Sequence, residues 1–413
     1  MTKTLFQKYF TDSFFLNAPL VINAAIALVT LPIILANLPI ADYGKWQFVL
    51  SFQVWVIVFS GTNITFASKR GIAKGLDGTF IYAFLKRFKL FFCISSLILF
   101  VAFYFKFSGN LIFSYLITII GLYLIFGYLF QISFLQFLIA KKRFKEWSIW
   151  QILISSVSLI GSAIIASLTK NIVYFALFQL GSITILSWIG WFWIVKKEKL
   201  IESYKRGEID KECVPYGLKL IPVDLVTVTS GKLSHFIIGP FFGFSNLAIF
   251  SVANKLRDAI ANLIKSARPL LYTDFARKGK EELIRIVNPY LIKIGMVGAG
   301  VVAISIVAGW IYIQFLLPPS FHQAIVYFCI LTLGLPAGVI TIILHTVLES
   351  HLRHKELTIA NIIPNLIKII LILALGYWGK IIGVCLALTI SMWISFIFYY
   401  IVIFKPTFLL IKP

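Results

Sequence analysis

The sequence predicts an all-α integral membrane protein with twelve transmembrane helices, arranged as two six-helix lobes related by a pseudo-twofold axis. Three observations lead to this prediction. Hydrophobic residues make up 60% of the 413 residues and charged residues only 13%, and the mean hydropathy is +0.93. Apolar runs of membrane-spanning length recur along the chain, and basic residues gather in alternate connections between them. Soluble domains carry about a quarter charged residues, so soluble enzymes, nucleic-acid-binding proteins and secreted disulfide scaffolds are excluded.

Twelve segments have the length of a membrane span, which is about 20 predominantly apolar residues. In chain order, the predicted spans are 13–36, 44–66, 88–107, 111–139, 147–168, 172–195, 216–239, 246–271, 289–317, 321–348, 357–377 and 381–404. The seventh and eighth are the least apolar, because each contains several charged residues. Charges within a span are the first indication of a functional site inside the membrane.

The basic residues predict the orientation of the chain, because Lys and Arg accumulate in the cytoplasmic loops of membrane proteins. Most of the 38 Lys and Arg lie at the two ends and in the even-numbered loops, where Lys86 and Arg87 are typical. The odd-numbered loops hold only Lys45, Lys106, Lys170 and Lys380. Both termini are therefore expected in the cytoplasm. Omitting only one of the seventh and eighth spans would place the later basic loops outside, so both are retained.

A polar segment in the middle of the chain predicts the division into lobes. Residues 196–215 form the longest polar stretch and are interpreted as a cytoplasmic linker between an amino-terminal lobe, 1–195, and a carboxyl-terminal lobe, 216–413. A weak internal similarity indicates duplication. Residues 36–51 and 239–254 each turn through a short loop containing Pro or Gly and then begin an aromatic-rich span. Transporters built from such repeats bind substrate at the interface between them.

The eighth span carries a polar stripe. Its members recur at steps of three and four residues, which places them on one face of a helix; they are Ser251, Lys255, Asp258, Asn262 and Lys265. A charged residue at the centre of a span costs roughly 2.5–3.5 kcal/mol, so such residues normally face protein or a water-filled cavity. A stripe of this length therefore needs water or a ligand beside it.

The charges within the spans predict a site for an anion. Lys and Arg outnumber the carboxylates among them, so pairing within the protein cannot neutralise the set, whereas a phosphate-bearing ligand would. The predicted substrate-binding residues of this cationic cavity are Lys232, Lys255, Lys368, Arg257 and Arg268. The residues expected to line the cavity or to couple an ion are Asp224, His235, Asp258, Asn262, Asn361, Asn365, Gln53, Asn63 and Asn17.

Structural roles remain alternatives for some of these residues. Arg268 lies close enough to the cytoplasmic end of its span for the guanidinium to reach the interface. Lys255 and Asp258, three residues apart, are candidates for a purely structural ion pair. Asp224 and His235 are alternatively explained as partners of backbone groups.

No catalytic chemistry is predicted. The sequence has no Walker A loop, HExxH motif or nucleophile elbow, and its four cysteines form no CxxC pair that would indicate a metal site. The short loops expected on the outer side leave no room for the carboxylates of a glycan-polymerising enzyme. The protein is thus predicted to be a transporter with no cofactor or metal. Coupling to a proton or sodium gradient through Asp224, Asp258 or His235 stays open.

Several segments resemble one family of transporters. They are Asp42–Trp46, Gly239–Ala253, Arg353–Lys355 and Gly379–Ala387, and they are similar to those of the Wzx-type O-antigen flippases of the multidrug/oligosaccharidyl-lipid/polysaccharide (MOP) exporter superfamily. The resemblance is diffuse but extends over nearly the whole chain.

The resemblance implies a function in lipopolysaccharide biosynthesis. It implies a flippase of the bacterial inner membrane that moves an oligosaccharide linked to undecaprenyl diphosphate from the cytoplasmic to the periplasmic leaflet by alternating access. The implied partners are this lipid-linked oligosaccharide and membrane lipids, and also a polysaccharide polymerase and a chain-length regulator.

Three other functions are alternatives. A cation-coupled multidrug exporter of the same superfamily is disfavoured by the basic residues within the spans, because its substrates are often cationic. A flippase for the peptidoglycan lipid precursor is disfavoured mildly, because such proteins usually have two further spans. A membrane glycan polymerase or ligase is disfavoured by the short outer loops.

Overall fold

The computed structural model describes residues 3–265, 275, 280–350 and 354–404, and their regular structure is helical throughout, with no strand among them. Seven of the described helices are long and apolar enough to cross a membrane, or up to nine if each of two bent pairs is one span. The all-α fold with many apolar helices is therefore confirmed, whereas the count of twelve spans and the cytoplasmic location of both termini stay predictions.

The predicted spans fall on described helices, apart from the end of the eighth, 266–271, which lies outside the described residues. The chain divides into two compact units, Met1–Val228 and Thr229–Pro413. The continuous long helices of the first unit are α1 (Lys3–Asn37), α4 (Thr79–Phe107), α7 (Phe144–Thr169) and α8 (Ile172–Lys197). Its interrupted or short helices are α2 (Ile40–Phe59), α3 (Thr62–Ala73), α5 (Leu111–Tyr123), the π-helical turn η1 (Leu124–Tyr128), α6 (Leu129–Ala140), α9 (Leu200–Lys205) and α10 (Cys213–Lys219).

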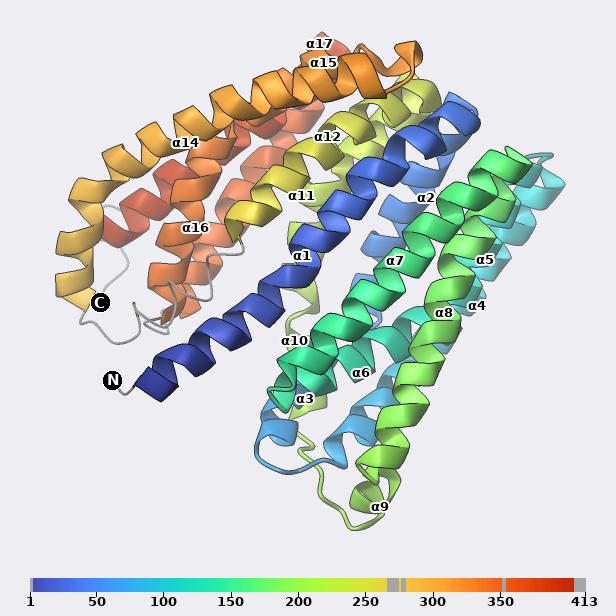
Figure 1. The fold of residues 1–413 in the computed structure, drawn as a ribbon, viewed down its shortest axis with the longest axis vertical. Coiled ribbons are helices and arrows are strands. Elements are labelled where there is room, and N and C mark those ends of the chain that lie inside the picture. The colour runs from blue at the N-terminus through green and yellow to red at the C-terminus, as the bar shows by residue number, and fades with distance from the viewer. Residues whose placement is uncertain (1–2, 266–274, 276–279, 351–353, 405–413) are drawn as a thin grey trace. The chain divides into compact units, whose positions relative to one another are not determined.

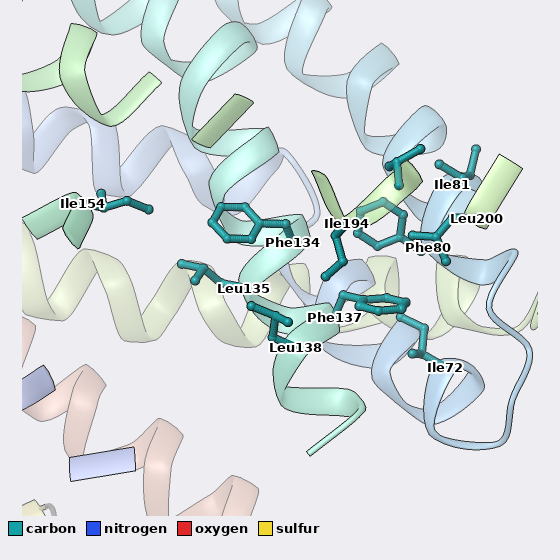
Figure 2. Packing of buried hydrophobic residues seen from close by; sticks show 11 residues of the cluster. Ile72, Phe80, Ile81, Phe134, Leu135, Phe137, Leu138, Ile154, Ile194 and Leu200 are labelled. Atoms are coloured by element: carbon teal, nitrogen blue, oxygen red, sulfur yellow. The ribbon is translucent and has the colours of Figure 1, made fainter. Parts of the chain in front are cut away.

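Aromatic and branched aliphatic side chains from α3, α4, α6, α7, α8 and α9 form a core of the first unit (Figure 2). Phe80 and Phe137 meet edge to face there, with ring centroids 5.4 Å apart. In a bilayer, helices associate through such close packing rather than through exclusion of water. This core includes α9, which connects the long helices to the polar middle of the chain.

The polar segment predicted as a linker packs against the first unit. Residues 196–215 form the end of α8, all of α9 and the start of α10. At Gly217 of α10, an added Cβ atom would lie 2.5 Å from the backbone nitrogen of Ile64, so α10 and α3 touch at backbone distance. The division into lobes 1–195 and 216–413 remains a prediction. The boundary between the two compact units falls at residues 228 and 229, within the sequence of the helix α11 (Ile221–Ile237).

The bend between α2 and α3 is held by a buried arginine. The two helices are inclined by 55°, and the chain turns through Gly61, whose φ of 67° favours glycine. Arg87 of α4 is fully buried; its Nε donates a hydrogen bond to the carbonyl of Ser60 at 3.3 Å, and its Nη1 donates to Thr65 Oγ1. The prediction that Arg87 lies in a loop is wrong, because the carbonyl exposed at the bend recruits the guanidinium into the helix bundle.

The second unit contains the charged helices. They are α11 (Ile221–Ile237), whose first residues belong to the first unit, and α12 (Phe244–Lys265), which follows the π-helical turn η2 (Ile238–Phe242). The remaining elements are α14 (Lys280–Leu316), η3 (Pro319–Phe321), α15 (Ala324–Thr332), α16 (Leu335–Ser350) and α17 (His354–Phe404). Within this unit α14 packs on α15 and α16, and α16 packs on α17 (Figure 1).

The long helix α17 contains a sharp break. Lys380 has φ 50° and ψ −131°, which lies outside the helical region and separates two helical segments. The break coincides with the boundary predicted between the spans 357–377 and 381–404. Just beyond it, an added Cβ atom at Gly383 would lie 1.8 Å from the carbonyl oxygen of Leu375, so the two segments meet backbone to backbone.

Replacing Gly383 by alanine is expected to destabilise the second unit, because the methyl group would overlap a backbone atom that cannot rotate away. Overpacking of this kind typically costs about 1–3 kcal/mol. The measurement is the midpoint of thermal unfolding in detergent, followed by intrinsic fluorescence. Gly379→Ala is the matched control, since no atom lies within 4 Å of a Cβ atom added there. Equal midpoints for the two variants would contradict the close contact.

Candidate functional site

Three helices of the second unit bring charged side chains together. Lys368 of α17 lies close enough to Lys232 of α11 and to Arg257 and Asp258 of α12 for their charges to act on it. Lys232 is in turn within electrostatic range of Lys255. We call Lys232, Lys255, Arg257, Asp258 and Lys368 the cation cluster. Within this cluster the four cations outnumber the single carboxylate.

A pocket of about 310 Å³ lies at this cluster. Arg257 and Asp258 line it from α12, and Lys368 lines it from α17. The other lining residues are Ala261, Leu335, Gly338, Val339, Thr341, Ile342, Leu388, Ser391, Met392 and Ser395. Pockets for small molecules range from about 300 to 1,000 Å³, so the volume suits an anionic head group rather than an oligosaccharide. The pocket thus combines two cationic donors with a largely apolar wall.

The hydroxyl groups in this wall donate to backbone carbonyls of their own helices. Thr341, Ser391 and Ser395 donate their protons to the carbonyls of Ala337, Leu388 and Ser391, at 2.7, 2.7 and 2.8 Å. A hydroxyl that donates within its own helix keeps oxygen lone pairs for a second partner. These oxygens suit the hydroxyl groups of a sugar, whereas an anion requires the N–H donors of Arg257 and Lys368.

Asp258 is held in place on α12 by its neighbours. Arg257 contacts it through Nη2 at 2.5 Å and through Nε at 3.1 Å, both to Oδ1. Asn254 donates to the other oxygen, Oδ2, at 3.0 Å. Because the side chain of Asp258 is 46% exposed and that of Arg257 only 15%, the pair lies at the rim of the protein matrix. Arg257 therefore presents part of its guanidinium to the pocket in a fixed orientation.

Two predicted polar residues of α17 have structural contacts. Asn365 accepts a hydrogen bond from Ser230 of α11 at 2.6 Å and donates to the backbone carbonyl of Asn361 at 2.8 Å. Asn361 accepts from the hydroxyl of Tyr399 at 2.8 Å. The two asparagines tie α11 to both segments of α17; Asn365 lies one turn before Lys368, and Asn361 lies two turns before it. Neither is among the described residues that line the pocket.

His235 of α11 is buried. Its ring packs edge to face against Phe250, with centroids 5.5 Å apart, and its Nδ1 lies 3.3 Å from the hydroxyl of Ser234. Lys232, Lys255 and Arg257 are all close enough to act on it electrostatically. The structure therefore brings His235 beside the cation cluster, one helical turn from Lys232.

The predicted residues of the first unit form a separate set. Asn63 of α3 donates to Asp224 Oδ2 at 2.5 Å, and Asp224 lies in the part of α11 that belongs to this unit. Gln53 of α2 is buried, and its Oε1 has no hydrogen-bond partner among the described residues. Asn17 of α1 is half-buried. Within this unit, the carboxylate of Asp224 is therefore paired with the neutral amide of Asn63.

Three further predicted residues are not among the described residues that line the pocket. Lys255 and Asn262 are exposed on α12, and Arg268 lies outside the described residues. Thr341, Ser391 and Ser395 were missed by the sequence reasoning. Their signal was weak, because a hydroxyl residue in an apolar span commonly bonds its own helix. The spacing of four residues between Ser391 and Ser395 is the feature that would have placed both on one face.

Comparison with known proteins relates this architecture to transporters. A family model described as polysaccharide biosynthesis protein matches residues 11–268, which is more than half of the chain. A search of curated protein sequences finds no match.

Solved structures match almost the full length of the chain. One is a MATE transporter in complex with MaL6, with a TM-score of 0.71, 12% identity and 97% of each chain covered. An inward-facing multidrug resistance MATE family transporter of the MOP superfamily has a TM-score of 0.70, 13% identity and 95% of each chain covered. A MOP superfamily transporter from Pyrococcus furiosus, for which reversed polarity of the binding pocket suggests a different function, has a TM-score of 0.69, 13% identity and coverages of 97% and 96%.

At these identities the structures establish the fold alone, which is that of the solved MATE transporters. The family model adds the relationship by sequence. The resemblance to Wzx-type flippases of the MOP superfamily is thereby confirmed. The chain belongs to the polysaccharide biosynthesis protein family and has the fold of the solved MATE transporters.

Proposed function

We propose that the protein is a flippase that moves an undecaprenyl-diphosphate-linked oligosaccharide, the repeat unit of a surface polysaccharide such as O-antigen, from the cytoplasmic to the periplasmic leaflet. The observation that carries this proposal is the pocket lined by Arg257 and Lys368 within a cluster of surplus positive charge. The diphosphate carries the negative charge of such a substrate, and this charge must be neutralised by cationic groups inside the membrane. Membership of the polysaccharide biosynthesis family supports the same class of substrate.

In this proposal the cation cluster neutralises the diphosphate while the head group passes the hydrocarbon layer. Lys368 and Arg257 donate to phosphate oxygens, and charge-assisted bonds of this kind are about twice as strong as neutral ones. The hydroxyl oxygens of Ser391 and Ser395 accept from the first sugar. Alternating access between two six-helix lobes then exposes the head group to the opposite leaflet.

The remaining features of the proposal concern cellular context. The flippase belongs in the bacterial inner membrane with both termini in the cytoplasm, and it delivers its cargo to a polysaccharide polymerase and a chain-length regulator. No cofactor takes part. A proton or sodium gradient drives the cycle through Asp224, Asp258 or His235, and transport measured with either gradient collapsed identifies the coupling ion.

A multidrug exporter is the second candidate, because solved relatives of the same fold include multidrug resistance transporters. Exported drugs are often cationic, and they would be repelled by four cations gathered around one carboxylate. A flippase for the peptidoglycan precursor shares the diphosphate chemistry, so the two flippase functions differ in the sugar that is carried.

Depletion of the protein in its native host is expected to cause a lipid-linked oligosaccharide to accumulate on the cytoplasmic face of the membrane. The measurement is extraction of the polyprenyl diphosphate lipids and mass spectrometry of the attached sugars. The accumulated amount should exceed the level in undepleted cells by about tenfold or more. Without a flippase, a lipid with so polar a head group crosses the membrane slowly, because the head group must leave water.

Drug susceptibility of the same cells serves as the comparison. Unchanged minimum inhibitory concentrations for cationic drugs, together with accumulated lipid-linked sugar, support the flippase. Increased drug sensitivity without accumulation would identify an exporter and overturn the proposal. Accumulation of the peptidoglycan precursor alone would retain the flippase but replace its cargo.

A further inference from the structure

A second cavity lies between α14 and α16, next to the cationic pocket. It has a volume of about 300 Å³, and α14 lines it with Lys293, Ile294, Val297, Gly298 and Val301. Val339 of α16 completes the lining. Apart from Lys293, every lining residue is apolar, so the cavity suits a hydrocarbon chain and offers few partners to a polar group.

The cavity lies beside a close contact between α14 and α16. At Gly298, an added Cβ atom would lie 3.2 Å from the Cα atom of Pro336, so the backbones are in close contact there. Gly298 itself lines the cavity, together with the branched side chains of Val297, Val301 and Val339. The close contact makes the cavity part of the α14–α16 packing rather than a gap in a loop.

Val339 connects the two cavities. It lines the apolar cavity and also the pocket that contains Arg257 and Lys368. The two spaces therefore adjoin at one side chain, with Arg257 and Lys368 on one side of Val339 and, on the other, a lining that is apolar apart from Lys293. This order of chemistry matches a phosphate ester of a lipid, in which the charged group is bonded directly to the first apolar unit of the chain.

We propose that the cavity between α14 and α16 holds the first isoprene units of the lipid carrier whose diphosphate is bound by Arg257 and Lys368. The inference rests on the proposed flippase function and adds the place of the apolar part. The lipid then lies against the outside of the second unit, and its chain leaves the protein between α14 and α16. Its branched methyl groups fill the space that the three valines leave empty.

A larger apolar groove on the same helices does not fit this role. It has a volume of about 710 Å³ and is lined by residues such as Met296 of α14, Pro336 of α16 and Trp393 and Phe396 of α17. On α17, Trp393 and Phe396 point away from the face of Ser391 and Ser395, which line the cationic pocket. A chain in this groove would be separated from the diphosphate by α16 and α17, so the groove provides the control.

Val297→Trp and Met296→Trp form a matched pair of variants. The two positions are adjacent on α14 and are 68% and 62% exposed, but Val297 lines the proposed cavity and Met296 lines the larger groove. The probe is a short-chain polyprenyl diphosphate with a diazirine in its first isoprene units. It is added to the full-length protein in nanodiscs of phosphatidylethanolamine and phosphatidylglycerol, and cross-linked peptides are identified by mass spectrometry.

In the unaltered protein, labelling is expected on residues 293–301 and around Val339, and unlabelled polyprenyl diphosphate should compete with the probe. Val297→Trp should weaken probe binding about tenfold, the loss expected when one branched alkyl group is displaced from a buried site. Met296→Trp should bind the probe like the unaltered protein. Inorganic diphosphate binding should be unchanged in both variants, because neither side chain lines the cationic pocket.

The labelled positions in the unaltered protein test the inference even if a tryptophan variant fails to fold. Labelling at Trp393 and Phe396, or equal loss of binding in both variants, would overturn the assignment of the cavity while leaving the flippase proposal intact. Competition by phosphatidylglycerol as strong as that by polyprenyl diphosphate would identify an ordinary membrane lipid as the occupant and overturn it as well. Failure of Lys368→Met to reduce diphosphate binding would instead contradict the function on which the inference rests.

Discussion

Replacement of Lys368 by methionine is expected to reduce surface polysaccharide display by about a hundredfold, because removal of one charged partner from a buried contact typically costs about 2–5 kcal/mol. Lys368 is half-buried in α17 and shares its pocket with Arg257. Methionine keeps much of the length and the apolar stem but removes the ammonium group that would contact phosphate. The measurement is polysaccharide on the cell surface of a depleted strain that carries the variant gene, normalised to the amount of variant protein in the membrane.

Two variants serve as controls for this result. Lys368→Arg keeps the charge and should restore display to within about tenfold of the unaltered protein, since the geometry of the donor changes but its attraction to phosphate remains. Lys106→Met removes an exposed lysine at the end of α4 and should have no effect. Normal display in Lys368→Met, with normal protein levels, would exclude Lys368 from substrate binding.

Substitution of Arg87 by methionine is expected to destabilise the first unit by about 3–5 kcal/mol, because it removes the donors of a buried network and leaves a carbonyl without a partner. The guanidinium connects Ser60 and Thr65 across the bend between α2 and α3, and it lies 5.1 Å from the ring centroid of Phe91. Arg87→Lys should recover only part of the stability, since a single ammonium group cannot reproduce the planar fork. The measurement is the midpoint of thermal unfolding in detergent.

Arg206→Met provides the comparison for Arg87. Arg206 follows α9 at the surface and pairs with Glu208 at 2.8 Å, with its side chain 59% exposed. Its removal should not change the unfolding midpoint measurably, because exposed ion pairs are screened by water. If Arg87→Met unfolded at the same temperature as Arg206→Met, the bend between α2 and α3 would have to be stabilised by the surrounding packing alone.

The helices of this protein are readable from its sequence because a bilayer demands long apolar runs and permits little else. The predicted span 172–195 corresponds to α8, and the predicted separation of the last two spans corresponds to the break at Lys380. In both cases the sequence pattern that predicts the structure is local: a run of apolar residues predicts the helix, and Gly379 and Lys380 predict where it is interrupted. The polar stripe of α12 is equally local, because helical periodicity alone places its members on one face.

Which charged residues share a pocket depends on packing that the sequence does not state. Arg257 lies outside the predicted stripe of α12, yet it lines the cationic pocket with Lys368, whereas Lys255 does not line it. The rotation of α12 about its axis is set by contacts with α15 and α16, and these contacts involve residues far away in the chain. Periodicity identifies a face of a helix, but only the neighbouring helices decide what that face meets.

Arg87 illustrates the same limit for a single residue. At the start of an apolar run, a basic side chain is expected to reach water, and the sequence supports that expectation. The bend between α2 and α3 breaks a helix inside the bundle and leaves the carbonyl of Ser60 without a helical partner. A buried acceptor needs a donor, and the guanidinium of Arg87 on the adjacent helix α4 supplies it. Local hydrophobicity therefore determined where the helices are, and the backbone groups freed by bending them decided which charges were drawn inside.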